Sequence, residues 1–236
     1  MLELHQFRHS AFCEKVRLVL AAKQLPYQVV EVTPGLGQLE LFRLSGQRQV
    51  PVLVDGAAVI ADSSAIALHL EAAAPDPALL PAEPVHRAQA LLLEDWADTA
   101  LASGARLALV QAAAANPVLR GALLPEATPG PLRALVGALP AGVLAGVGQV
   151  LDQEPLQQLR RNLQQLTALV QAGPYLVGDR LSLADLAVAA QLSLLLFPAS
   201  AGAPLAGLGV AGLADDPALA PLFQWRDRIT AEVGRC

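Results

Sequence analysis

The stretch Gln49-Val50-Pro51-Val52-Leu53-Val54-Asp55-Gly56 decides the fold. A proline, then a β-branched run, then Asp-Gly is the pattern of a strand that ends in a tight hairpin turn. Because proline cannot donate a hydrogen bond within a sheet, Pro51 is expected at the first residue of the strand, where its peptide bond can be cis. Ala58-Val59-Ile60 then supplies the second strand of the predicted hairpin.

The run Asp62-Ser63-Ser64 follows this hairpin and opens an apolar pattern at Ile66, Leu68 and Leu70. Asp and Ser are favoured N-cap residues, so a helix is predicted to begin here. The N–H groups at a helix N-terminus attract anions. The run is therefore a candidate site for a carboxylate, with Asp62 available to face an ammonium group. In the alternative interpretation it only caps the helix.

The residues before the hairpin predict two strands and two helices in alternation. Strands are expected at residues 2–7 and 27–32, where apolar or β-branched residues follow strand patterns. Helices are expected at 10–24 and 38–44, where apolar residues recur at helical spacing. The resulting order, β-α-β-α-β-β-α, indicates a thioredoxin-like domain over residues 1–74.

The residues after this domain predict a second, larger domain. Residues 75–84 are rich in proline and form the expected linker. Residues 85–236 are predicted to be all-helical, with a long helix over 85–113 and an amphipathic helix over 153–172. The proline- and glycine-punctuated stretch 116–151 is interpreted as an insertion with short helices, of no assigned role.

The run Ser182-Leu183-Ala184-Asp185 has the spacing of a capping box. In that motif the N-cap hydroxyl and the side chain three residues later each bond to the other residue's backbone N–H. Both side chains are therefore assigned a structural role at the start of a helix. A last helix is expected around Pro221–Trp225.

Charge and cysteine content exclude several classes of function. The formal net charge is −5, so electrostatics gives no basis for nucleic-acid binding. The two cysteines, Cys13 and Cys236, supply neither a disulfide framework nor a paired metal motif. His69 and His86 have no partners at metal-ligand spacing, so no metal site is expected. The start of the chain has no secretory pattern, and a reducing, cytoplasmic location is expected.

Hydrophobic residues make up 54% of the chain, mostly as alanine and leucine, which favours helices. Residues 134–151 and 186–214 contain no charged side chain, and each is long enough to raise the question of a membrane span. Both are interrupted by proline and glycine, and their hydropathy rests largely on alanine. Buried helices and loops are therefore favoured over membrane association.

Ser10 and Cys13 stand at the start of the first predicted helix with Ser-x-x-Cys spacing. In thioredoxin-like proteins the first position of such a motif carries the exposed nucleophile, because a helix N-terminus stabilises a thiolate. Serine occupies that position here, so the motif cannot form an internal disulfide. Cys13 lies on the apolar stripe of the helix, whereas Glu14, Lys15 and Arg17 are expected to face outward.

Taken together, these patterns resemble the cytosolic glutathione transferase superfamily. The resemblance covers the element order through residue 74 and the Gly-Asp-x-x-Ser-x-Ala-Asp run that ends at Asp185. It implies that glutathione is the cosubstrate. Val50, before a cis Pro51, would pair its backbone with the cysteinyl part of glutathione, and Asp62 and Ser63 would hold the γ-glutamyl end.

The resemblance assigns the catalytic role to Ser10, in a Ser-Ala-Phe-Cys start that is similar to serine-type, bacterial chi-like enzymes. The Ser10 hydroxyl would donate to the glutathione thiolate and lower the thiol pKa. Gln49 matches a position that faces the glycyl carboxylate, and Arg48 would assist it electrostatically. Arg8 and His9 lie near enough to Ser10 in sequence to assist the thiolate or line the substrate side, whereas the favoured alternative leaves both in a solvent-exposed loop.

The implied function is conjugation of the glutathione thiolate to a small apolar electrophile, without a metal, by a homodimer. Two alternatives stay open: a non-catalytic binding module of the same fold, and a thiol transferase that uses Cys13 as its nucleophile. A third interpretation limits Ser10 to a helix cap. The sequence does not specify the electrophile.

Overall fold

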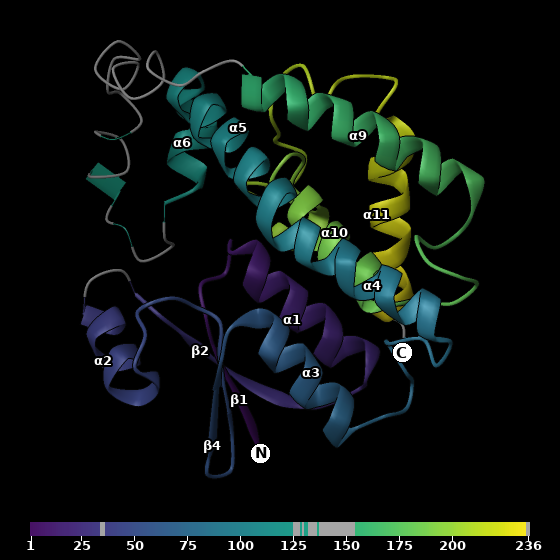
Figure 1. Cartoon of the computed structure of the whole chain (residues 1–236). Coiled ribbons are helices and arrows are strands. Elements are labelled where there is room, and N and C mark those ends of the chain that lie inside the picture. Colours follow the sequence, from purple (N-terminus) through teal and green to yellow (C-terminus); the bar gives the residue numbers. More distant parts are fainter. Residues whose placement is uncertain (34–35, 125–127, 129, 132–135, 137–153, 235–236) are drawn as a thin grey trace.

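The computed structural model describes residues 1–33, 36–124, 128, 130–131, 136 and 154–234. Most of the predicted 116–151 insertion therefore lies outside the described residues. Figure 1 shows a sheet with flanking helices in the N-terminal part of the chain and a helical assembly in the rest.

The sheet has four strands in the order β2-β1-β3-β4. Their bounds are β1 (Leu2–Gln6), β2 (Tyr27–Glu31), β3 (Val52–Asp55) and β4 (Ala58–Ala61). β1 runs parallel to β2 and antiparallel to β3, while β3 and β4 form the predicted hairpin, in which Asp55 pairs with Ala58. Gly56 takes a φ of 59° in the turn, a conformation that glycine adopts without strain.

Three helices flank this sheet: α1 (Ala11–Ala22), α2 (Leu36–Ser45) and α3 (Ser63–Ala73). α1 and α3 pack against one another and share a core with Leu4 and Leu53 of the sheet. α2 packs separately, through a small cluster of Val32, Leu41 and Val52. This is the predicted thioredoxin-like arrangement, and in Figure 1 α2 stands apart from α1 and α3.

The helical part is organised around a buried helix. Its elements are α4 (Pro84–Trp96), η1 (Ala97–Leu101), α5 (Ala102–Ala115), α6 (Pro117–Ala122), α9 (Glu154–Ala172), α10 (Leu183–Leu192), the short η2 (Ala199–Ala201) and α11 (Ala220–Val233). Every residue of α10 is buried, and the helix packs against α1, α4 and α11. Burial in a protein core therefore explains why residues 186–192 of this helix carry no charged side chain. Among the described residues, none of the helices has the length and apolar character to cross a membrane.

Two local predictions for the helices are wrong. The helix expected over 85–113 is not a continuous α-helix, because η1 interrupts it with π-helical hydrogen bonding. Lys15 was expected to face outward from α1 but is fully buried. Carboxylates from α4 and η1 meet its ammonium group in the interior, and no pattern within α1 itself reveals that partnership.

The capping motif at Ser182 forms as an internal brace. The Asp185 carboxylate accepts the Ser182 backbone N–H at 2.8 Å, the Ser182 hydroxyl at 2.7 Å and the Leu176 N–H at 2.8 Å. Burial raises the pKa of Asp185, and these hydrogen bonds oppose the rise. The two side chains secure the start of α10, which is the structural role that their spacing predicts.

Candidate functional site

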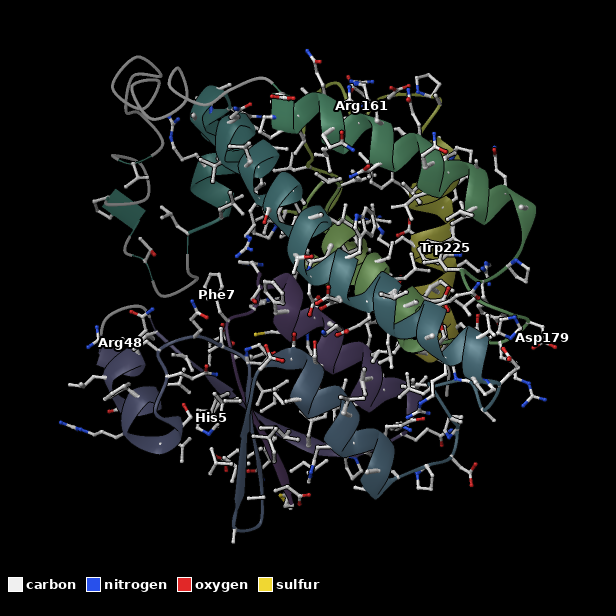
Figure 2. All side chains as sticks on the ribbon, viewed as in Figure 1. His5, Phe7, Arg48, Arg161, Asp179 and Trp225 are labelled. Carbon is white, nitrogen blue, oxygen red and sulfur yellow. The ribbon has the colours of Figure 1, made fainter. Side chains whose placement is uncertain are left out.

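A cleft of about 890 Å³ lies where the sheet domain meets η1 and α5. Residues singled out from the sequence that line it are Ser10, Arg48, Gln49, Val50, Pro51, Asp62 and Ser63. They come from the start of α1, the loop before β3 and the start of α3. Figure 2 shows Phe7, at the end of β1, and Arg48, beside α2, on the same side of the molecule, opposite Trp225.

Arg8 and His9 do not line this cleft. They line a second cavity of about 610 Å³, bounded by α1, β2, the end of α11 and the segment around η2. The His9 ring meets that of Phe7 edge to face, with ring centroids 5.7 Å apart. Ser10 lines both the cleft and the second cavity, so these two hollows meet at its position.

Ser10 is the N-cap residue of α1. Its Oγ accepts a hydrogen bond from the Cys13 N–H at 3.4 Å, and its backbone is extended, as is usual for a cap. This contact uses a lone pair of the hydroxyl oxygen and not the hydroxyl proton. A capping role and donation to a thiolate are therefore compatible at this side chain.

Cys13 is a fully buried free thiol on the core side of α1. Burial raises its pKa, against smaller opposing effects from the Ser10 side chain and the Phe7 backbone. A raised pKa keeps the thiol neutral at physiological pH, and burial withholds it from solvent. These properties are typical of a structural cysteine and not of a reactive one.

Asp62, and not a serine, caps α3. Its Oδ1 accepts the N–H groups of Ser64 at 2.9 Å and of Ala65 at 3.1 Å. Two of the amides expected to be open to a carboxylate are thus occupied, and the cap does not reach the N–H of Ser63. Asp62 itself has a φ of 84°, a sparsely populated conformation that is concentrated at ligand-binding positions.

The loop before β3 presents its backbone and polar side chains to the cleft. The Val50–Pro51 peptide bond is cis, as expected from the sequence. The guanidinium carbon of Arg48 lies 5.6 Å from the centre of the Phe42 ring on α2, which holds this cation at the rim. Gln49 lies between Arg48 and Val50 in the sequence and also lines the cleft.

A charge cluster that the sequence patterns do not predict lies behind the cleft. Lys15 Nζ donates to Glu94 Oε1 at 2.6 Å, to Ser64 Oγ at 3.1 Å and to Asp98 Oδ2. The cluster joins α1 and α3 of the sheet domain to α4 and η1 of the helical part. A spacing of four residues between Glu94 and Asp98 was the one available signal, and it does not identify a partner on another element.

Asp98 connects this cluster to the cleft that it borders. Ser63 Oγ donates to Asp98 Oδ2 at 3.2 Å, and both residues line the cleft. One lysine faces the two carboxylates of Glu94 and Asp98, so the cluster carries an excess of negative charge. Asp98 belongs to η1, and π-helical turns within α-helices are frequent at functional sites.

Comparison with known proteins identifies the family. The N-terminal domain of glutathione S-transferases matches residues 4–78, and the C-terminal domain of glutathione S-transferases matches residues 138–205. Maleylacetoacetate isomerase of Rattus norvegicus is 30% identical over 199 residues, which are 80% of this chain and 76% of the relative. The chain therefore belongs to the cytosolic glutathione S-transferase superfamily, which the sequence patterns resemble.

Two further similarities bear on function and fold. FtsZ-localized protein A of Caulobacter vibrioides is 29% identical over 196 residues, 81% of this chain and 76% of that protein. A theta class glutathione S-transferase from Xanthomonas axonopodis pv. citri, solved with glutathione bound, has a TM-score of 0.63 and 20% identity. That structural match covers 100% of this chain and 97% of the other, and it shows a common fold.

Proposed function

We propose that this protein binds glutathione in the cleft and conjugates it, through its sulfur, to a small apolar electrophile. One observation carries the proposal: Ser10, Val50-Pro51 and Asp62-Ser63 come from three separate parts of the sequence and line one cleft. Each has a different chemical capacity, and together they match the polar groups of one tripeptide.

The γ-glutamyl end is assigned to the start of α3. Its carboxylate would accept a hydrogen bond from the Ser63 N–H, the first amide of α3, which the Asp62 side chain does not bind. Its ammonium group would lie toward the carboxylates of Asp62 and Asp98. The excess negative charge of the Lys15 cluster supports this orientation, because a cation at that position balances it.

The remaining groups of glutathione are assigned along the loop before β3. The cysteinyl backbone would pair with that of Val50. The glycyl carboxylate would lie near Gln49 and Arg48, where the guanidinium favours an anion. This orientation brings the sulfur toward the start of α1, where Ser10 is the cap.

Ser10 is proposed to stabilise the thiolate. Its hydroxyl would donate a hydrogen bond to the sulfur, and the N-terminus of α1 would add a favourable field. Lowering a thiol pKa from about 8.5 to about 6.5 corresponds to roughly 2.7 kcal/mol and makes the thiolate the main form at neutral pH. Holding thiolate and electrophile together supplies the rest of the acceleration.

The electrophile needs apolar surface beside the sulfur. Phe7 and Phe12 flank Ser10 in sequence and line the same cleft, so they are assigned this role. Arg8 and His9 lie in the second cavity. An auxiliary role for these two residues requires an electrophile that extends past Ser10 into that cavity.

A homodimer in the cytoplasm is proposed from family membership. Light scattering coupled to size-exclusion chromatography tests the oligomeric state directly. A mass of one subunit at working concentration would reject the homodimer and leave the proposed chemistry untouched, because all the assigned residues belong to one chain.

A non-catalytic binding module is the second candidate function. The similarity to FtsZ-localized protein A, a protein named for where it localises and not for a reaction, favours it. Turnover measurements with several electrophiles, made after glutathione binding is established, separate the two candidates. Glutathione binding without turnover of any electrophile would favour the binding module.

Glutathione affinity tests the proposed orientation. Asp62→Asn combined with Ser63→Ala removes a charge and a hydroxyl while asparagine keeps the cap. The matched control is Glu83→Gln, since Glu83 caps α4 by accepting from Val85 and His86 N–H groups at 3.0 and 2.7 Å, away from the cleft. Calorimetry should show at least about tenfold weaker glutathione binding in the double variant alone. Equal affinities would reject this orientation.

A further inference from the structure

Arg106 of α5 lines the cleft together with Phe7 and Phe12, and so adds a positive charge beside apolar surface. Its guanidinium carbon lies 5.3 Å from the centre of the Phe12 ring, and its Nε donates to the Ala102 carbonyl at 3.2 Å. These two contacts fix the plane of the group. They leave both terminal nitrogens without an ion pair among the residues that the structure describes.

The acidic side chains of the cleft do not neutralise this cation. Asp98 precedes Arg106 by eight positions on nearly continuous helix, which separates their backbones by about 12 Å. No ion pair joins Arg106 to Asp98 or to Asp95 within the described structure, although all three side chains line the cleft. Asp98 Oδ2 already accepts hydrogen bonds from Lys15 Nζ and from the Ser63 hydroxyl.

Glutathione does not account for Arg106 either. Its two carboxylates are assigned to the start of α3 and to the loop that carries Gln49 and Arg48. Among the described residues that line the cleft, Arg48 and Arg106 are the cations, and each lies against a different phenylalanine ring, Phe42 and Phe12 respectively. Arg106 is thus a positioned cation against the Phe12 ring, in the cleft that Ser10 also lines, with no assigned anion.

We propose that Arg106 binds a carboxylate on the second substrate, so that the preferred acceptor is a small apolar electrophile that carries one negative charge. This inference rests on the proposed function. The planar guanidinium matches the two oxygens of a carboxylate, while Phe12 and Phe7 contact the apolar body. Arg106 is a specificity-determining residue: it holds the acceptor and exchanges no proton with it.

An aryl chloride illustrates the step. The glutathione sulfur forms a bond to the ring carbon that bears chlorine, the carbon–chlorine bond breaks, and chloride leaves with the bonding pair. The proton of the thiol has already passed to solvent on thiolate formation. The carboxylate on the far side of the ring keeps its charge throughout, so its contact with Arg106 changes substrate binding more than the chemical step.

The test compares two acceptors, chlorodinitrobenzene and its carboxylate analogue chlorodinitrobenzoate, in the wild type and in Arg106→Gln. We expect kcat/KM for the carboxylate acceptor to fall about tenfold or more in the variant, mainly through KM, with the neutral acceptor changed less than about twofold. Arg106→Lys should recover part of the loss. Arg161→Gln, on the exposed side of α9, is the control (Figure 2).

A binding measurement makes the inference independent of turnover. Calorimetry with the two corresponding S-aryl glutathione conjugates should show that Arg106→Gln weakens the carboxylate conjugate selectively. Equal weakening of both conjugates, as a role in thiolate binding would give, overturns the inference while the proposed function stands. Equal affinity of the wild type and the variant for the carboxylate conjugate would also overturn the inference and leave the proposed function standing. Failure of wild-type protein to bind glutathione or either conjugate would overturn both.

Discussion

Two buried lysines, Lys15 within α1 and Lys23 at its C-cap, show how the same side chain serves two different purposes. Both ammonium groups are sealed from solvent, and each meets three oxygen-bearing partners. Lys23 Nζ contacts Glu71 at 2.7 Å and the carbonyls of Ala74 and Pro77 at 2.6 and 3.0 Å. These partners fasten the end of α3 and the following connection, and none of them lines the cleft.

Lys15 differs in charge balance and in position. Its partners include two carboxylates, Glu94 and Asp98, whereas Lys23 faces one. Two of its partners, Ser64 and Asp98, line the cleft. The Lys23 cluster is therefore a neutral clamp, while the Lys15 cluster is a negatively charged support that connects the helical part to the proposed glutathione site.

Lys15→Met should have the largest effect. It leaves the buried Glu94 and the partly buried Asp98 beside one another without a cation, and loss of one partner from a buried ion pair costs about 3–5 kcal/mol. Urea unfolding measures this change. If Lys15→Met does not fold, Lys15→Met with Glu94→Gln removes one charge of each sign and should recover much of the stability. No recovery would mean that packing, not charge, dominates.

Lys23→Met should lower stability by about 1–3 kcal/mol and leave glutathione affinity unchanged. The loss is smaller because one carboxylate is left behind and Glu71 retains 17% of its side-chain exposure, so water can solvate it. Urea unfolding and calorimetry on the same samples measure both quantities. A fall in glutathione affinity in Lys23→Met would erase the distinction between the two clusters.

Asp98→Asn should weaken glutathione binding about tenfold, which corresponds to about 1.4 kcal/mol of binding free energy. It should change the free energy of unfolding by less than about 1 kcal/mol. The reason is that Lys15 and Glu94 remain as a neutral pair while the cleft loses the proposed partner of the ammonium group. Calorimetry with glutathione provides the affinity. Undiminished binding would remove Asp98 from the site and leave it a purely structural role.

Cys13→Ala should have the smallest effect, a loss of about 1 kcal/mol from the small cavity and no change in turnover. Cys13 lies on α1 two residues before Lys15 and belongs to neither cluster. Since burial raises the pKa of Cys13, the thiol should stay neutral and unreactive toward alkylating agents at neutral pH. Alkylation should become faster only at a pH above the ordinary pKa of a cysteine thiol. Rapid alkylation at neutral pH, with loss of activity, would restore the thiol-transferase alternative.

Local patterns predicted the parts of the fold that depend on a few consecutive residues. The hairpin after Pro51, the cap at Ser10 and the brace at Asp185 all follow from turn and capping chemistry within short segments. The thioredoxin-like order follows from the sequence of such segments. The site residues Val50-Pro51 and Asp62-Ser63 came from a family resemblance, and the structure adds that they line one cleft with Ser10.

Long-range partnerships could not be predicted in this way. Lys15 and Glu94 are 79 positions apart, and a lysine on an amphipathic helix ordinarily faces water. The π-helical segment Ala97–Leu101 contains neither glycine nor proline, so no helix breaker distinguishes it from the helices on either side. The proposed role of Arg106 depends on the cleft that it lines and on its contact with the Phe12 ring. Both arise from residues distant in sequence, so no local pattern around Arg106 predicts them.

The central claim is that the sulfur of bound glutathione lies at Ser10 and is held there as a thiolate. Ultraviolet titration of glutathione bound to the wild type and to Ser10→Ala tests it most directly. We predict a thiol pKa below the free value of about 8.5 in the wild type, and a rise toward that value in Ser10→Ala with far less change in glutathione affinity. The same titration curve in both proteins, with full turnover in Ser10→Ala, would contradict the claim.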